Sequence, residues 1–173
     1  MASPHATCTA PRRLPQGYRT RGGRPAGSHR PCGRVVPHVR FLLDTHAWVW
    51  AVLGDSRLGR SARKALASLG PGECVGLAAI SLKEAAWHLA HGRITLTDAG
   101  AGWATWLREA SSAPRLEVLP LSVEVAIESE HFPDSFPADP ADRLIAATAR
   151  VHDLTLLTAD AELRGRTELR TLW

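Results

Sequence analysis

The sequence predicts an α/β domain with a parallel β-sheet and helices on both faces. From residue 39 onward, short apolar segments of strand length alternate with segments of helical pattern. This alternation is typical of βαβ units joined by right-handed crossovers. Residues 74–80 form a continuous apolar run, as expected of a strand buried on both faces of a parallel sheet. With 173 residues and 45% hydrophobic content, the chain has enough apolar material for a single core.

The expected elements follow one another in a regular order. Four to five strands are predicted, over about 39–43, 74–80, 116–121, 154–157 and, as the fifth, 169–173. Helices are predicted over 45–53, 59–69, 81–90, 98–111, 123–130 and from Pro140 to about His152. Asp139 followed by Pro140 is typical of an N-cap and a first helical position. Core-facing positions in the fourth and last helices are Trp103, Trp106, Leu107, Ala110, Leu144, Ile145, Thr148 and Val151.

The chain divides into residues 1–37, a basic tail rich in Pro, Gly and Arg, and a domain over 38–173. Residues 1–40 contain eight arginines and no acidic residue, whereas the other 133 residues carry 13 of the 21 Lys and Arg residues and all 17 acidic ones. The tail lacks apolar periodicity and is expected to be disordered. Two interpretations stay open: an extension outside the mature chain, or a segment that attracts phosphates.

Composition excludes several classes of protein. No run of 18 uncharged apolar residues is present, and the N-terminus lacks the apolar region of a secretory signal. We therefore expect no membrane contact and a cytoplasmic location. The three cysteines, Cys8, Cys32 and Cys74, match neither a disulfide framework nor a zinc site.

Two aspartates come directly after apolar strands. Asp44 follows Phe41-Leu42-Leu43, and Asp160 follows the strand that ends at Leu157. In a parallel sheet both emerge at the carboxyl edge, where open α/β sheets bind ligands. The alternative for each is a helix N-cap.

Three further acids are expected near the same edge. Glu84 lies one turn into a helix that follows a buried strand, but Ser81 and Glu84 also fit a capping box. Asp139 is most simply an N-cap. Asp142 either complements the helix dipole or contributes to the site, and of these two aspartates it is the better functional candidate.

Carboxylates that converge at one edge repel each other unless a cation neutralises them. Oxygen ligands without a His or Cys set suit Mg²⁺ or Mn²⁺ and argue against zinc. Such ions support phosphodiester hydrolysis. Thr45 and Thr158 adjoin the acids and are secondary candidates that orient a ligand or water, with helix capping as the alternative. His46 is a candidate substrate contact or a packing residue, whereas His88 and His91 lack a third ligand.

Four motifs in order resemble those of the PIN-domain ribonucleases, in particular the VapC-type toxins of bacterial toxin-antitoxin pairs. They are Leu42-Leu43-Asp44-Thr45-His46 with Trp48 or Trp50, Ile80-Ser81 through Glu84 to Gly92-Arg93-Ile94, Asp139 through Ala149, and Leu157-Thr158-Ala159-Asp160. Two features depart from the family pattern. Lys83 stands where relatives often have Trp, and the extension before residue 39 has no counterpart.

The resemblance implies a three-layer α/β/α domain with a Mg²⁺- or Mn²⁺-dependent endoribonuclease site. The four family acids map to Asp44, Glu84, Asp142 and Asp160, and Asp139 matches an additional acid. We expect Asp44 and Asp142 to be the principal metal ligands. The resemblance also implies an RNA substrate, a homodimer and a small inhibitory antitoxin.

Two other functions compete with this interpretation. An aspartyl-phosphate phosphatase would need a second Asp two residues after Asp44, where this chain has His46. A catalytically inactive PIN-like module that binds RNA or protein is the non-enzyme alternative.

Overall fold

The computed structural model describes residues 38–96 and 102–173. In this part of the chain, five strands form one parallel sheet in the order β3-β2-β1-β4-β5. The strands are β1 (His38–Leu43), β2 (Glu73–Ala78), β3 (Leu116–Leu119), β4 (Thr155–Leu157) and β5 (Thr171–Leu172). The predicted fold class is therefore confirmed. Predictions about residues 1–37, including Cys8 and Cys32, lie outside the described residues.

Seven helices accompany the sheet within the described ranges. They are α1 (Thr45–Leu53), α2 (Arg60–Ala67), α3 (Ala79–Ala90), α4 (Trp103–Ser111), α5 (Val123–Glu130), α6 (Pro140–Val151) and α7 (Ala161–Arg164). The four-residue helix α7 was not predicted. None of the helices seen here is long and apolar enough to cross a bilayer.

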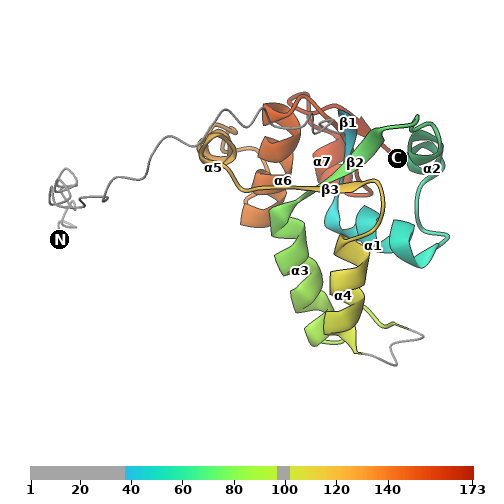
Figure 1. Ribbon diagram of the computed structural model, residues 1–173. Helices are drawn as coiled ribbons and strands as arrows, with labels where there is room; N and C mark the ends of the chain where they lie inside the picture. The colour runs from blue at the N-terminus through green and yellow to red at the C-terminus, as the bar shows by residue number, and fades with distance from the viewer. Residues whose placement is uncertain (1–37, 97–101) are drawn as a thin grey trace, which may run out of the picture. The chain divides into compact units, whose positions relative to one another are not determined.

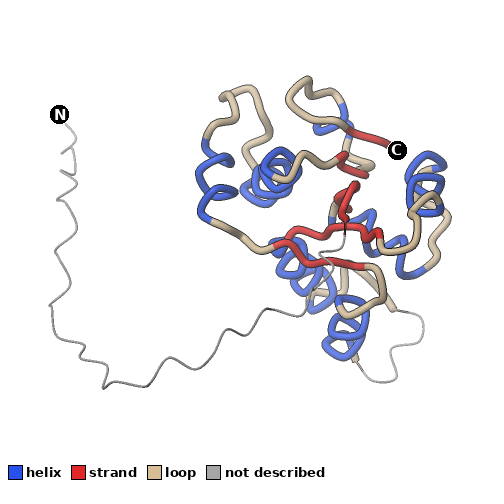
Figure 2. The backbone as a smooth tube through the Cα atoms, turned by 45° about the horizontal axis from the view of Figure 1, so that its top comes forward, coloured by secondary structure: helices blue, strands red, loops and turns tan. Residues whose placement is uncertain are grey.

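The helices form layers on the two faces of the sheet (Figures 1 and 2). One core joins the sheet to α1, α2, α3 and α4, and the other joins it to α5, α6 and α7. Helix α3 lies beside α4 (Figure 1) and contacts α1, α4 and α6. Because α3 begins directly after β2, its first turns stand at the carboxyl edge of the sheet, between the two layers.

Strand β1 shows why a short apolar run specifies a central strand. Leu42 and Leu43 are almost completely buried but belong to different cores, because successive side chains of a strand point to opposite faces. Strand β1 pairs with β2 on one side and with β4 on the other. A strand in this position needs apolar residues on both faces, as the sequence has.

The strand order creates a topological switch point at β1. After β3 the chain crosses to the opposite side of β1 to form β4 and β5. Ligands of open α/β sheets bind at the carboxyl ends of the strands beside such a point. Asp44 follows β1 and Asp160 follows β4 by three residues, so both flank the switch point.

The loop before α6 is fixed by one arginine. The Arg143 guanidinium donates to the backbone carbonyls of Ser129, Phe132 and Pro137. The rings of Phe132 and Phe136 stack with centroids 4.1 Å apart and are buried. These contacts hold the start of α6, and therefore the two aspartates of its first turn, at the carboxyl edge.

Two predicted core positions are wrong. Trp103 is 41% exposed, since it stands at the first residue of α4 rather than within it. Val151 is 39% exposed because it is the last residue of α6, where the helix has passed the end of the core. The segment predicted to begin α4 at residue 98 falls mainly outside the described residues.

Replacing Ile145 by Ala is expected to lower the free energy of unfolding by about 2–5 kcal/mol, because the side chain is completely buried in the core between sheet and α6. Val151→Ala on the same helix is the matched control and should change it by less than about 0.5 kcal/mol. Urea denaturation followed by circular dichroism measures both. Equal losses for the two variants would contradict the described packing of α6.

Candidate active site

Five carboxylates line one cavity of about 590 Å³ at the carboxyl edge of the sheet. They come from the ends of strands and the first turns of helices, which the fold brings together from distant parts of the chain. The remaining lining residues are Thr45, His46, Trp50, Arg57, His88 and Ala159. The acids are Asp44, Glu84, Asp139, Asp142 and Asp160, which are the five that the sequence predicted to converge.

Asp44 is the most buried of these acids, with 6% of its surface exposed. It precedes α1, but its side chain makes no capping hydrogen bond. Instead its Oδ2 accepts a hydrogen bond of 2.8 Å from the Thr158 hydroxyl, which itself accepts one of 3.0 Å from the Asp160 backbone N–H. Burial raises the pKa of Asp44, and the Thr158 hydrogen bond opposes this rise. Asp44 therefore occupies the N-cap position of α1, but its carboxylate does not cap the helix and is directed to Thr158 instead.

Glu84 is held in place by Thr45. The Thr45 hydroxyl donates a hydrogen bond of 2.7 Å to Glu84 Oε2, which joins the start of α1 to α3. Burial raises the pKa of Glu84, with smaller contributions from the charges of Asp44 and Asp139. The capping-box alternative is wrong because α3 begins at Ala79, two residues before Ser81.

Asp139 and Asp160 each have a structural role as well. Asp139 Oδ1 accepts from the Ala141 backbone N–H and Asp160 Oδ1 accepts from that of Glu162, both at 2.7 Å, so these side chains cap α6 and α7. Each cap occupies one carboxylate oxygen. Both residues also line the cavity, and the second oxygen of each carboxylate accepts no hydrogen bond within the described residues, so capping and a role in the site are compatible.

Asp142 stands one turn into α6 and accepts no hydrogen bond from any part of the chain that the structure describes. Its pKa is raised to about 7, first by burial and then by the charges of Asp139, Asp44, Asp160 and Glu84. The carboxyl group is therefore poised to lose its proton when a cation enters the cavity.

The negative charge of the cavity has little internal compensation. Arg57 lines it, but its guanidinium is paired with Asp55, with nitrogen and oxygen 2.6 Å apart. Across residues 38–96 and 102–173, no group of three or more His, Cys, Asp or Glu side chains is already arranged to hold a metal ion. The donor set nevertheless fits a hard divalent cation, because it consists of carboxylate oxygens supported by threonine hydroxyls.

Three lining residues were missed or given little weight in the sequence. Trp50 was noted only as a possible part of the first family motif, and Arg57 carries no local signal for a site. Both reach the cavity through the packing of α1 and the turn after it. His88 was set aside as a metal ligand, yet its ring lies 5.5 Å from that of His46 at the cavity wall. Lys83, beside Glu84, is exposed and does not line the cavity.

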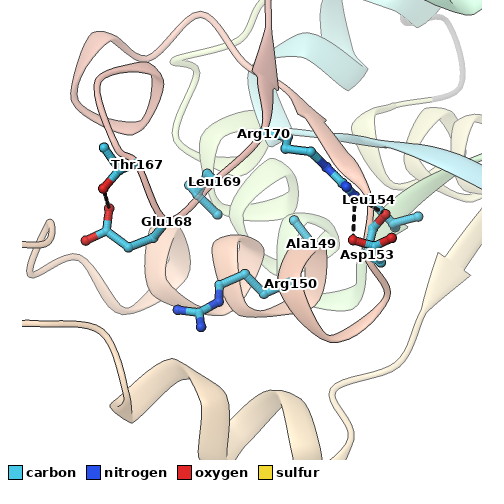
Figure 3. Close-up of a pocket in the computed structure, with 8 residues that line it drawn as sticks. All are labelled: Ala149, Arg150, Asp153, Leu154, Thr167, Glu168, Leu169 and Arg170. Carbon is cyan, nitrogen blue, oxygen red and sulfur yellow. Dashed lines mark hydrogen bonds and ion pairs between the residues drawn. The ribbon is translucent and has the colours of Figure 1, made fainter.

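A second cavity, of about 270 Å³, lies near the amino ends of β4 and β5, away from these acids (Figure 3). Its charged groups are satisfied by neighbours. Arg170 donates to the carbonyl and the carboxylate of Asp153, and Arg150 pairs with Glu128 at 2.9 Å. This cavity therefore offers no free set of acids for catalysis.

The fold and the acidic cavity define a class of protein: a three-layer α/β/α domain with carboxylates gathered at the carboxyl edge of a parallel sheet. Residues 41–168 match the family model described as PIN domain. The chain belongs to the PIN-domain family.

Comparison with individual proteins agrees with this assignment. The chain is 35% identical over 134 residues to Ribonuclease VapC22 of Mycobacterium tuberculosis, covering 76% of this chain and 97% of the relative. The fold is similar to that in a structure of VapBC2 from Rickettsia felis bound to a promoter DNA fragment (TM-score 0.58, 18% identity, 78% and 97% coverage). It is also similar to Mycobacterium tuberculosis VapC20, described as a sarcin-ricin loop cleaving toxin (TM-score 0.51, 20% identity, 75% and 98% coverage).

The raised pKa of Asp142 predicts a pH-dependent cost to stability. Its ordinary value is 3.8, so between pH 4 and 7 the metal-free folded protein retains a proton that the unfolded chain releases. The stability from this proton is fully present below pH 4 and is lost as pH rises through 7. Because the group is partly exposed, solvent screening reduces the effect to about 1–2 kcal/mol.

In EDTA, Asp142→Asn should therefore be more stable than the original protein at pH 8, and this advantage should disappear near pH 4. Thermal unfolding across this pH range measures the difference, with Asp134→Asn, at an exposed position of the 132–138 loop, as the control. An advantage that is the same at both pH values would show that the cause is not the titration of Asp142.

Proposed function

We propose that the domain of residues 38–173 is a divalent-metal-dependent endoribonuclease that acts as the toxin of a toxin-antitoxin pair. The observation that carries this proposal is the convergence of Asp44, Glu84, Asp142 and Asp160 in one cavity at the switch point of a PIN fold. Ribonuclease activity is supported by the name of the 35% identical relative, whose sequence is matched over almost its whole length.

The cation is proposed to be Mg²⁺ or Mn²⁺, held by Asp44 and Asp142, with Asp160 and Glu84 binding directly or through water. Asp139 is a secondary contributor. When bound, such an ion activates water and stabilises the negative charge that develops on the phosphate. The raised pKa values of Asp44, Glu84 and Asp142 support this assignment, since an added positive charge would favour the ionised form of all three.

The threonines have positioning roles in this proposal. Thr158 donates to the Oδ2 atom of Asp44, and Thr45 donates to Oε2 of Glu84. Each hydrogen bond restricts the rotation of the carboxylate and so also restricts the position of its second oxygen. Both threonines are almost fully buried. Their hydroxyls therefore reduce the rotational freedom of the acids before substrate binds.

The partner is proposed to be a small antitoxin. Structures of similar fold are described as VapBC or toxin-antitoxin complexes, two of them with promoter DNA or bound DNA. We propose that the reaction takes place in the cytoplasm, where an RNA substrate and a protein inhibitor of this kind would meet. The homodimer implied by the resemblance stays a prediction.

Replacing Asp44 or Asp142 by Asn should reduce RNA cleavage by about 100-fold or more, because each variant removes a charge that the reaction needs. The assay is end-mapped cleavage of total cellular RNA with Mg²⁺ or Mn²⁺, with EDTA as the metal-free arm. Asp134→Asn is the matched control and should cleave at the original rate.

Cleavage that survives in EDTA, or in either variant, would contradict the proposed ligands. An absence of cleavage by the unaltered protein, together with an absence of ion binding, would favour the inactive PIN-like module.

A further inference from the structure

Five aromatic side chains form a continuous series that starts at the acidic cavity and runs along α3. The ring of Trp50 lies 5.7 Å from that of His46, and His46 lies 5.5 Å from His88. The series continues from His88 to Trp87 at 5.2 Å and from Trp87 to His91 at 4.7 Å. We call these five residues the aromatic track.

The track is accessible to a ligand. Trp87 is 40% exposed, and both His46 and His91 are exposed. Trp50 and His88 are partly buried, and Trp50 packs against the core on the α1 side, so the most accessible part of the track is its Trp87 and His91 end.

Two arginines lie on the track. The Arg57 guanidinium is 5.1 Å from the centre of the Trp50 ring, and that of Arg93 is 4.6 Å from the centre of the Trp87 ring. Arg57 is paired with Asp55, whereas Arg93 forms no ion pair within the described ranges. Burial lowers the pKa of His88, and His46 and then the charges of Arg93 and Lys83 lower it further. The track is thus more cationic than the acidic cavity beside it.

The track and the acidic cavity are connected. A groove of about 570 Å³ adjoins the cavity, and it is lined in part by Arg93, Ile94 and Thr95. Trp87 and His91, at the far end of the track, do not line this groove, and Trp87 reaches it only through its contacts with His88 and Arg93. Four residues line both spaces, namely His46, Trp50, Arg57 and His88. A chain bound in the groove would therefore enter the acidic cavity without leaving the protein surface.

We propose that the aromatic track, with Arg57 and Arg93, binds the single-stranded part of the RNA substrate that flanks the cleaved phosphodiester. This inference rests on the nuclease function proposed above. Aromatic faces stack on bases of any sequence, and arginines bind the phosphates between them. Bases of a duplex are already stacked and are not available to such rings, so the substrate class is unpaired RNA.

The test is fluorescence anisotropy with a fluorescein-labelled 12-nucleotide single-stranded RNA of mixed sequence. The full chain carries Asp142→Asn so that the probe is not cut. Adding Trp87→Ala or Arg93→Ala should weaken binding by about fivefold to tenfold, as expected for the loss of one stacked base or phosphate contact. The affinity for an RNA duplex of the same length should fall by less than twofold in the same variants.

The matched controls are Trp103→Ala and Arg108→Ala on α4. Trp103 is as exposed as Trp87 but belongs to no part of the track, and Arg108 is an exposed arginine without an ion pair in the described residues. Both should bind within about twofold of the parent. All variants share residues 1–37, so any contribution of that segment cancels.

A second readout separates binding from folding. In the otherwise unaltered enzyme, Trp87→Ala should raise KM for RNA while kcat stays the same, because the track acts on the flank and not on the reacting atoms. A merely structural loss would lower kcat and the melting temperature instead.

Equal affinities for the track and control variants, or no binding of single-stranded RNA by the parent, would overturn the inference. If RNA binding depends on Trp87 but the unaltered protein does not cleave RNA, the proposed nuclease function is contradicted and RNA binding by the aromatic track is not. If the protein cleaves RNA but its affinity for RNA does not depend on Trp87, only RNA binding by the aromatic track is contradicted. The exposed rings would then fit a surface for a protein partner.

Discussion

The parallel pairing of β1 with β4 is the constraint on which the site depends. The Asp44 backbone N–H donates to the Leu157 carbonyl at 3.1 Å, which extends the ladder one residue beyond the strand. This pairing brings Thr158 within hydrogen-bond distance of the Asp44 carboxylate, although the two residues are 114 positions apart in sequence. A one-residue slip between the strands would separate them and would also exchange the two faces of β1.

The clustered acids of the site lower the stability of the folded domain. Burial and mutual repulsion raise the pKa of Asp44, Glu84 and Asp142. Without a metal ion, ionising these groups in the folded domain therefore costs free energy that apolar side chains at the same positions would not cost. The apolar residues on both sides of the sheet compensate for this cost by completing two cores. Conflict between local electrostatics and folding is expected at functional sites, where the structure serves binding rather than stability.

Much of this arrangement could be predicted because its signals are local. Asp44 and Asp160 follow apolar runs, and the Asp139-Pro140 pair marks the start of α6. The role of Glu84 could not be decided locally, because Ser81 suits a cap equally well and only the end of β2 at Ala78 places the helix start earlier. The place of Trp50 and Arg57 at the cavity was missed since it depends on how α1 packs against α3, which no sequence spacing encodes.

The two proposals assign different tasks to neighbouring surfaces. The acidic cavity repels a polyanion until a cation is present, whereas the aromatic track offers rings and arginines that attract it. Such a division explains how a domain whose residues 41–173 are acidic overall can hold RNA next to a cluster of carboxylates. The bound strand would be positioned by the track while the cation neutralises the cavity.

The most direct test of this account is titration of Mn²⁺ into the purified protein by calorimetry near pH 7.5, with Asp142→Asn and Asp134→Asn alongside. The account predicts that the unaltered protein and Asp134→Asn bind the ion equally, and that Asp142→Asn binds it at least about tenfold more weakly. In a second titration near pH 6, below the raised pKa of about 7, proton release that accompanies binding would be expected from Asp142. An absence of Mn²⁺ binding, or equal affinity in all three proteins, would contradict the claim that the converging acids form a cation site.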